Sequence, residues 1–214
     1  MTAPPICYLE GTHISTVVGE RKIEDLAIGD LLITVEGHVR PVKWIGRMSY
    51  KKSNRQWQRS VLPVKIMAGA LGSGLPKHDL FVSQKHKLFM ENVLVSAEDL
   101  INGETIKIVA IDDTAKLCYY HVALETHDAI IAEGQPAETL RTDAANREKF
   151  ENFAEYLRLY PNEDGKKLKP FAPLAKPRGL RMLVLALGLS GLVSDPRDKA
   201  RAKVSLAKSD ILYR

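Results

Sequence analysis

The chain has 214 residues, enough for one domain with a sizeable core, or for one domain with an extension. Apolar residues make up 45% and charged residues 27%, which excludes collagen-like, low-complexity and wholly disordered chains. The net charge of +5 is uneven: residues 1–140 carry 15 basic and 17 acidic side chains, and residues 141–214 carry 16 and nine. Because residues 1–140 lack a basic excess to neutralise phosphates, we expect no nucleic-acid partner.

Cysteine content and apolar runs bear on the compartment. The two cysteines, Cys7 and Cys118, exclude a disulfide framework and favour a reducing compartment. Residues 1–6 have neither the positive region nor the apolar run of a secretory signal. The longest apolar stretch, residues 182–193, falls short of the roughly 20 residues that span a bilayer. We therefore predict a cytoplasmic protein, and the sequence leaves the oligomeric state open.

Short apolar runs of strand length, separated by Gly, Asn and Asp, fill residues 7–140. Residues 31–35 and 38–45 are predicted as two strands joined by a tight turn at Glu36-Gly37. Residues 96–100 are predicted as a short helical turn with Ser96 as its N-cap. Further strands are predicted at residues 61–68, 80–82, 87–90, 105–111, 117–124 and 129–132. Many short strands with frequent turns predict an all-β body.

The composition changes after residue 140. Apolar spacings of three and four predict an amphipathic helix over residues 144–160, which Pro161 ends. Residues 162–179 carry three prolines among lysines and are predicted as an extended linker. In residues 179–214 an apolar segment precedes a basic one. Such a tail can contact an anionic membrane surface weakly or, more commonly, pack as a helix on its own β body. We expect residues 141–214 to be dispensable for the fold of residues 7–140.

Several side chains are candidates for chemistry. Cys7 opens the string Cys-Tyr-Leu-Glu-Gly-Thr-His-Ile-Ser-Thr; a lone cysteine is usually a small buried hydrophobe, but a thiol here can attack the preceding peptide bond. Ser83 lies three residues before His86, a pair that alone is typical of an ordinary turn. His121 and His127 flank a strand-rich stretch and by default are core or surface histidines. No pair has compact metal-ligand spacing, so we expect neither metal nor cofactor.

Together these segments resemble the Hedgehog/intein (Hint) autoprocessing family, and within it the bacterial Hint-domain proteins that lack a splicing C-terminus. The matching pieces are residues 7–16, 23–30, 42–47, 68–72, 79–86, 100–103, 119–127 and 132–134. The resemblance implies a compact, pseudo-twofold, horseshoe-shaped all-β fold with a partly helical basic extension. It divides the chain into a leader (residues 1–6), a Hint domain (7–140) and an extension (141–214).

The resemblance also implies roles for the five candidates. Cys7 matches the nucleophile, and Ser83 and His86 match the Thr-x-x-His motif, with Ser in place of Thr. His121 falls where splicing inteins usually have Asp, and His127 matches a histidine of the same late block. The Cys7 thiol would attack the preceding carbonyl, with His86 as proton donor, Ser83 as hydrogen-bond partner and His121 as proton shuttle or activator of water. We therefore expect Cys7 to lie near His86 or His121.

The implied function is an N–S acyl shift with single-turnover cleavage or acyl transfer at the Ile6–Cys7 bond, and the chain's own N-terminal peptide is the substrate. After Gly134 the chain continues Gln-Pro-Ala-Glu-Thr, where a splicing intein would have His-Asn, so splicing is not expected. The alternative is a degenerate Hint fold that serves as a binding or presentation module. Cys118 is predicted to be structural, on an apolar face with Tyr120 and Val122, and to react with thiol reagents more slowly than Cys7.

Overall fold

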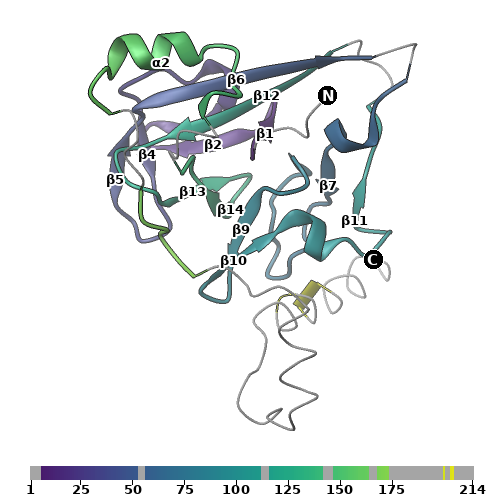
Figure 1. Ribbon diagram of the computed structural model, residues 1–214. Helices are drawn as coiled ribbons and strands as arrows, with labels where there is room; N and C mark the ends of the chain where they lie inside the picture. The colour runs from purple at the N-terminus through teal and green to yellow at the C-terminus, as the bar shows by residue number, and fades with distance from the viewer. Residues whose placement is uncertain are drawn as a thin grey trace, which may run out of the picture.

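The fold is known from a computed structural model, which describes residues 6–52, 56–111, 116–141, 147–163, 168–173, 200 and 203–204 (Figure 1). Two antiparallel sheets make up the body. The first has the order β11-β7-β8-β1-β12-β6, and the second has the order β10-β9-β14-β13-β2-β4-β5, with β3 paired to β2. The domain is therefore all-β with a small helical extension, as the sequence predicted.

The strands of the first sheet are β1 (Tyr8–Leu9), β6 (Trp44–Lys51), β7 (Val64–Ile66), β8 (Leu80–Val82), β11 (Ile106–Ile108) and β12 (Lys116–Ala123). Those of the second are β2 (His13–Thr16), β3 (Gly19–Lys22), β4 (Leu31–Ile33), β5 (Val39–Pro41), β9 (Lys87–Met90), β10 (Val93–Ser96), β13 (Ala129–Ala132) and β14 (Gln135–Glu138). Three 3-10 turns, η1 (Ile23–Asp25), η2 (Arg59–Val61) and η3 (Ala97–Leu100), and the helix α2 (Phe153–Leu159) complete the elements with described bounds.

Tight turns join several neighbouring strands, as the Gly-rich punctuation indicated. Glu133 and Gly134 take positive φ angles of 47° and 79° between β13 and β14, and Glu91 and Asn92 take 49° and 62° between β9 and β10. Two consecutive positive φ angles are typical of the two-residue turns whose twist matches that of paired strands. Such turns keep the strands short and place their ends at the rim of the body.

Two hydrophobic clusters fill the interior. The larger, which includes Tyr8, Ile14 and Leu80, lies between the two sheets' apolar faces. The smaller contains Cys7, Leu9, Trp44, Val61, Leu117, Tyr119, Ala123, Leu140, Phe150 and Tyr156. Adjacent residues of a strand point to opposite faces, so Cys7 and Leu9 belong to one cluster and Tyr8 to the other. Residues on both sides of position 140 thus share the smaller cluster.

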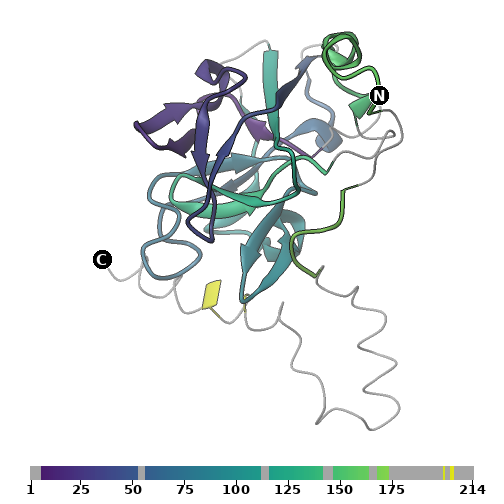
Figure 2. The same cartoon turned by 90° about the vertical axis from the view of Figure 1, so that its left-hand side faces the viewer.

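The helix predicted over residues 144–160 is shorter in the structure. Only Phe153–Leu159 forms α2, residue 147 is helical, residues 148–152 form turns and a bend, and residues 144–146 lie outside the described part. The Asn152 side chain accepts a hydrogen bond from Arg47 N and donates one to Ile45 O, both at the edge of β6. These bonds lay the segment along β6, so tertiary contacts override the helical periodicity. In Figures 1 and 2, α2 stands on the outside of the β body.

Two other local predictions need correction. The predicted strand over residues 38–45 is split into β5 and β6, because Val42 donates its N–H to Asp30 and accepts from Gly29 instead of continuing a ladder. Ser96 precedes η3 as expected, but its side chain makes no capping hydrogen bond. The first N–H groups of η3 are bonded instead to the carbonyls of His86 and Gln84.

No helix in the described part of the chain has the length and apolar character needed to cross a bilayer. The apolar run at residues 182–193 and most of the basic tail lie outside that part. The predicted contact of the tail with an anionic membrane surface therefore stays a prediction.

Candidate active site

Two hydrogen bonds join Cys7, the residue before β1, to Ser83, the residue after β8. The Cys7 N–H donates to the Ser83 hydroxyl at 2.9 Å, and the Ser83 N–H donates to the Cys7 carbonyl at 2.9 Å. Tyr8 pairs with Val82 in the adjacent register, which fixes the two segments side by side. The Ser83 hydroxyl thus contacts the nitrogen of the Ile6–Cys7 peptide bond directly.

His86 and His121 lie next to Tyr8 and next to each other, so the three rings form a triangle. The Tyr8 and His86 ring centroids are 4.3 Å apart, those of Tyr8 and His121 are 5.8 Å apart, and the two imidazoles are 5.2 Å from each other. Both histidines are fully buried. Within the described residues, His86 has no hydrogen-bond partner at either ring nitrogen, and His121 has none at Nδ1. Unpartnered buried nitrogens are costly and therefore mark candidate reacting groups.

Burial also decides the charge of these two imidazoles. Removal from water lowers the pKa of His86 well below its usual value, and the nearby His121 and Lys87 lower it further. Burial likewise lowers the pKa of His121, with additional contributions from His127 and Lys87. Both rings are therefore neutral at pH 7, and each carries one N–H donor and one acceptor nitrogen.

The thiol of Cys7 points into the smaller cluster and is 0% exposed. Burial raises the pKa of the Cys7 thiol well above its usual value, so the thiolate is disfavoured at rest. In the β1–β12 pairing, Tyr8 is opposite Tyr120 and Leu9 is opposite Tyr119. Continuing this register by one residue puts Cys7 opposite His121. Contact between the sulfur and an imidazole remains a prediction.

His127 is hydrogen-bonded at Nδ1, and its Nε2 has a carboxylate nearby but no hydrogen-bond partner among the described residues. The Phe171 N–H donates to His127 Nδ1 at 2.8 Å, and His127 Nε2 lies 3.4 Å from a Glu138 carboxylate oxygen. The other Glu138 oxygen accepts hydrogen bonds from the N–H and the side chain of Lys87, at 3.1 and 3.0 Å. Because Nδ1 accepts a hydrogen bond, the ring proton is placed on Nε2, facing Glu138. The hydrogen bond from Phe171 occupies Nδ1 and favours a positioning role for His127 over a proton-accepting one.

Cys118 lies in β12 as predicted but is more exposed than a buried structural cysteine. In β12 the buried side chains at this end are Leu117, Tyr119 and His121, whereas Cys118 and Tyr120 are partly exposed. Cys118 shares this face of β12 with Tyr120 and Val122, as predicted, and those two side chains pack in the larger cluster, but Cys118 itself is only partly buried. Since Cys7 is fully buried and Cys118 is not, burial favours faster reaction at Cys118, the opposite of the order expected from the sequence. Both cysteines are free thiols.

Sequence reasoning missed the two residues that connect the candidate groups. Tyr8 contacts both His86 and His121 and donates its hydroxyl to the Glu138 carbonyl at 3.1 Å. Its position directly after the candidate nucleophile was a usable signal. Glu138 offered none, because its partners lie far away in the sequence. In the described residues no three His, Cys, Asp or Glu side chains are arranged to hold a metal ion.

Comparison with protein families places this geometry in a known group. The family profile described as "Hint domain" matches residues 6–144, about two thirds of the chain. The chain belongs to the Hint domain family. The nematode Caenorhabditis elegans has a relative, Warthog protein 1, that is 25% identical over 142 residues. That match covers 59% of the present chain and only 28% of the relative, so this Hint domain corresponds to a small part of that protein.

Solved structures similar to this Hint domain include inteins and intein-like domains. The intein-like domain from Clostridium thermocellum is 16% identical, with a TM-score of 0.43 over 62% of this chain and 96% of that one. A DnaB mini-intein variant is 12% identical, with a TM-score of 0.45 over 67% and 100% of the two chains. The MchDnaB-1 intein variant is 15% identical, with a TM-score of 0.42 over 62% and 99%.

Proposed function

We propose that this Hint domain carries out a cysteine-dependent N–S acyl shift at the Ile6–Cys7 bond and then cleaves or transfers the acyl group without splicing. The observation that supports it best is the 2.9 Å hydrogen bond between the Cys7 amide nitrogen and the Ser83 hydroxyl. That nitrogen is the leaving group of the shift. A hydroxyl already in contact with it can stabilise the nitrogen as it loses its amide character and becomes basic.

The shift needs no external acid or base. Cys7 Sγ bonds to the Ile6 carbonyl carbon, the carbon–nitrogen bond breaks, and the thiol proton ends on the new Cys7 amine. A neutral imidazole suits this transfer, because it can accept one proton while it donates another. Burial keeps both His86 and His121 neutral.

We assign the acceptor role to His121, which the extended β1–β12 register puts opposite Cys7. The backbone N–H of His86 bonds the Ser83 carbonyl at 3.0 Å and closes the Ser83 turn, and we assign to the His86 ring the donation of a proton to the leaving nitrogen. Proton transfer between the two rings, whose centroids are 5.2 Å apart, restores both. Water or another acyl acceptor then attacks the thioester, releasing the polypeptide that ends at Ile6 and freeing the Cys7 thiol.

A non-catalytic binding or presentation module is the second candidate. The complete burial of Cys7 favours it, because burial raises the pKa of the thiol and hides it from external acceptors. The two functions differ in one property: only autoprocessing converts the Ile6 carbonyl from an amide into a thioester that external nucleophiles can attack.

Incubation of the purified protein with dithiothreitol or hydroxylamine, followed by intact mass measurement, tests the proposal. The wild type should lose the mass of the residues before Cys7, and Cys7→Ala should lose none. His86→Ala should slow cleavage by about 10²- to 10⁴-fold, and Ser83→Ala by less. His38→Ala, at an exposed histidine, and Cys118→Ser are the matched controls and should cleave like the wild type. A folded wild type that stays intact would leave the presentation module as the function.

A further inference from the structure

The segment 147–163 closes the open edge of β6, the last strand of the first sheet. The Glu151 N–H donates to the Arg47 carbonyl at 2.9 Å, and the Glu151 carboxylate accepts from the Ser49 N–H at 2.9 Å. Asn152 bonds Arg47 N at 2.8 Å and Ile45 O at 2.9 Å. An edge strand otherwise presents a row of unpaired backbone groups to solvent. Residues beyond position 140 therefore complete the sheet that holds Cys7.

The same segment packs aromatic rings into the cluster that buries Cys7. Phe150 and Tyr156 meet Trp44 edge-on, at centroid distances of 5.5 and 5.2 Å. Phe150 lies directly over Gly46, where a Cβ atom would come within 2.6 Å of the ring. Gly46 is the register partner of His121 in the β6–β12 pairing. The segment is thus in contact with the backbone that positions a candidate catalytic residue.

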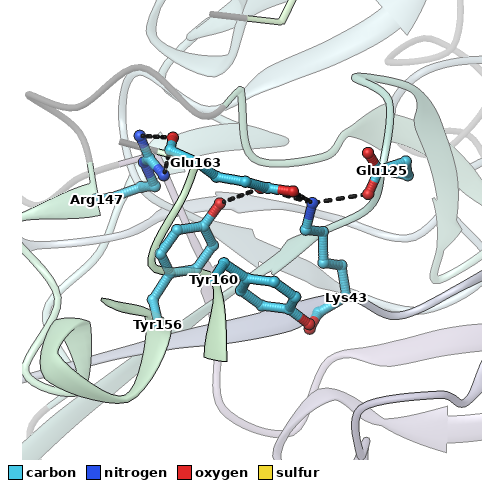
Figure 3. Close-up of polar contacts among 6 residues, drawn as sticks. All are labelled: Lys43, Glu125, Arg147, Tyr156, Tyr160 and Glu163. Atoms are coloured by element: carbon cyan, nitrogen blue, oxygen red, sulfur yellow. Dashed lines mark hydrogen bonds and ion pairs between the residues drawn. The ribbon is translucent and has the colours of Figure 1, made fainter. Parts of the chain in front are cut away.

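One partly buried cation holds the end of the segment on the β body (Figure 3). Lys43 Nζ lies 2.7 Å from both carboxylate oxygens of Glu163 and 2.7 Å from Glu125, and the lysine side chain is only 10% exposed. Glu163 also accepts the Tyr156 hydroxyl at 3.0 Å, and the Tyr160 hydroxyl donates to the Lys43 carbonyl at 2.7 Å. Such charge-assisted bonds are about twice as strong as neutral ones.

We propose that residues 147–163 form a cap over the Cys7 side of the domain and that the Lys43–Glu163 pair is its latch. With the latch closed, the smaller cluster is sealed and acyl acceptors are kept from the thiol. Opening of the cap uncovers Cys7 without unfolding the sheets, because Cys7 is held by β1–β12 pairing and by Ser83. Control of thioester resolution by the cap rests on the proposed function; control of access to the thiol does not.

Alkylation of the native protein with iodoacetamide, with each cysteine quantified by peptide mass spectrometry, tests the cap. Glu163→Gln keeps the shape of the side chain and removes its charge, and it should raise the labelling rate of Cys7 about tenfold, the effect of losing one charged hydrogen bond. Glu125→Gln is the matched control. It removes a carboxylate that contacts the same lysine but belongs to the β body, so Cys7 labelling should change less than twofold.

Cys118 reports on general loosening in the same sample, because it lies on the other, partly exposed face of β12. The cap predicts a faster rate at Cys7 alone. Equal Cys7 rates in the wild type and Glu163→Gln would overturn the proposal, and so would a parallel rise at both cysteines. Tyr160→Phe, which deletes only the hydrogen bond to the Lys43 carbonyl, should give a smaller rise at Cys7 and guards against misfolding of the charge variant. The readout is the alkylation rate of Cys7 and not cleavage, so the experiment can support or refute the cap even in a domain that never cleaves.

Discussion

Gly46→Ala should destabilise the protein, although Ala normally suits a strand better than Gly. The new Cβ atom would lie 2.6 to 2.8 Å from three carbons of the Phe150 ring, whereas carbon atoms pack best at roughly 3.5 to 4.0 Å. The ring must therefore retreat by about 1 Å, in a cluster where Trp44 already packs against it. Overpacking of this kind costs about 1–3 kcal/mol, which lowers the melting temperature by about 2 to 12 °C.

Urea denaturation and differential scanning calorimetry measure this effect, and a double-mutant cycle attributes it. In a Phe150→Ala background the clash is absent, so Gly46→Ala should be neutral or stabilising by up to about 1 kcal/mol, because Ala restricts the unfolded chain. A Gly46→Ala protein as stable as the wild type, or the same destabilisation in both backgrounds, would refute the packing of residues 147–163 onto β6. A fall in the dependence of unfolding free energy on urea would instead indicate loss of the cap.

Three further outcomes follow from burial and charge. Cys118 should react with 5,5′-dithiobis(2-nitrobenzoate) faster than Cys7 in the native protein, and the reverse order would contradict the burial of Cys7. The free energy of unfolding should fall as pH drops below about 6.5, because burial depresses the folded-state pKa of His86 and His121 and only the unfolded chain takes up their protons. Each histidine contributes up to about 1.4 kcal/mol per pH unit to this fall. In urea titrations at several pH values, a His86→Phe variant should show a shallower dependence of unfolding free energy on pH. Glu133→Gln should lower stability by about 1–3 kcal/mol in the same assay, since this buried carboxylate bonds two imidazoles and a backbone N–H; an unchanged midpoint would show that those bonds contribute nothing.

Composition alone could not show whether the fold of residues 7–140 needs residues 141–214. Truncation after residue 140 was expected to leave the fold intact, but Phe150 and Tyr156 are buried in the same cluster as Cys7. The sequence predicted a helix, a linker and a basic tail in residues 141–214, and nothing in that composition indicated that single residues complete the core of the β body. The buried rings and the latch at Glu163 are single residues within that composition, and their partners on β6 or at Lys43 just before it are about 105 to 120 positions away.

The sequence by itself determined the class of fold and the outline of the candidate site. Residues 80–82, 87–90 and 129–132 are strands with the predicted bounds, because short apolar runs between turn residues have few other ways to bury themselves. The Ser-x-x-His spacing also placed Ser83 and His86 on one turn, whose closing bond is local. Local periodicity and turn chemistry are properties of neighbouring residues, so they can be read without knowing the fold.

Only the tertiary structure decided which way the key side chains face and what covers them. Burial alternates over residues 116–121 of β12, but which of these side chains are buried, and the burial of all three residues 121–123, depend on the pairing of β12 with both β1 and β6. The same pairing directs the Cys7 side chain toward the cluster that residues 147–163 seal, and it leaves Cys118 partly exposed. The two faces of β12 are chemically similar, and the choice between them is made by contacts between segments at least 65 residues apart.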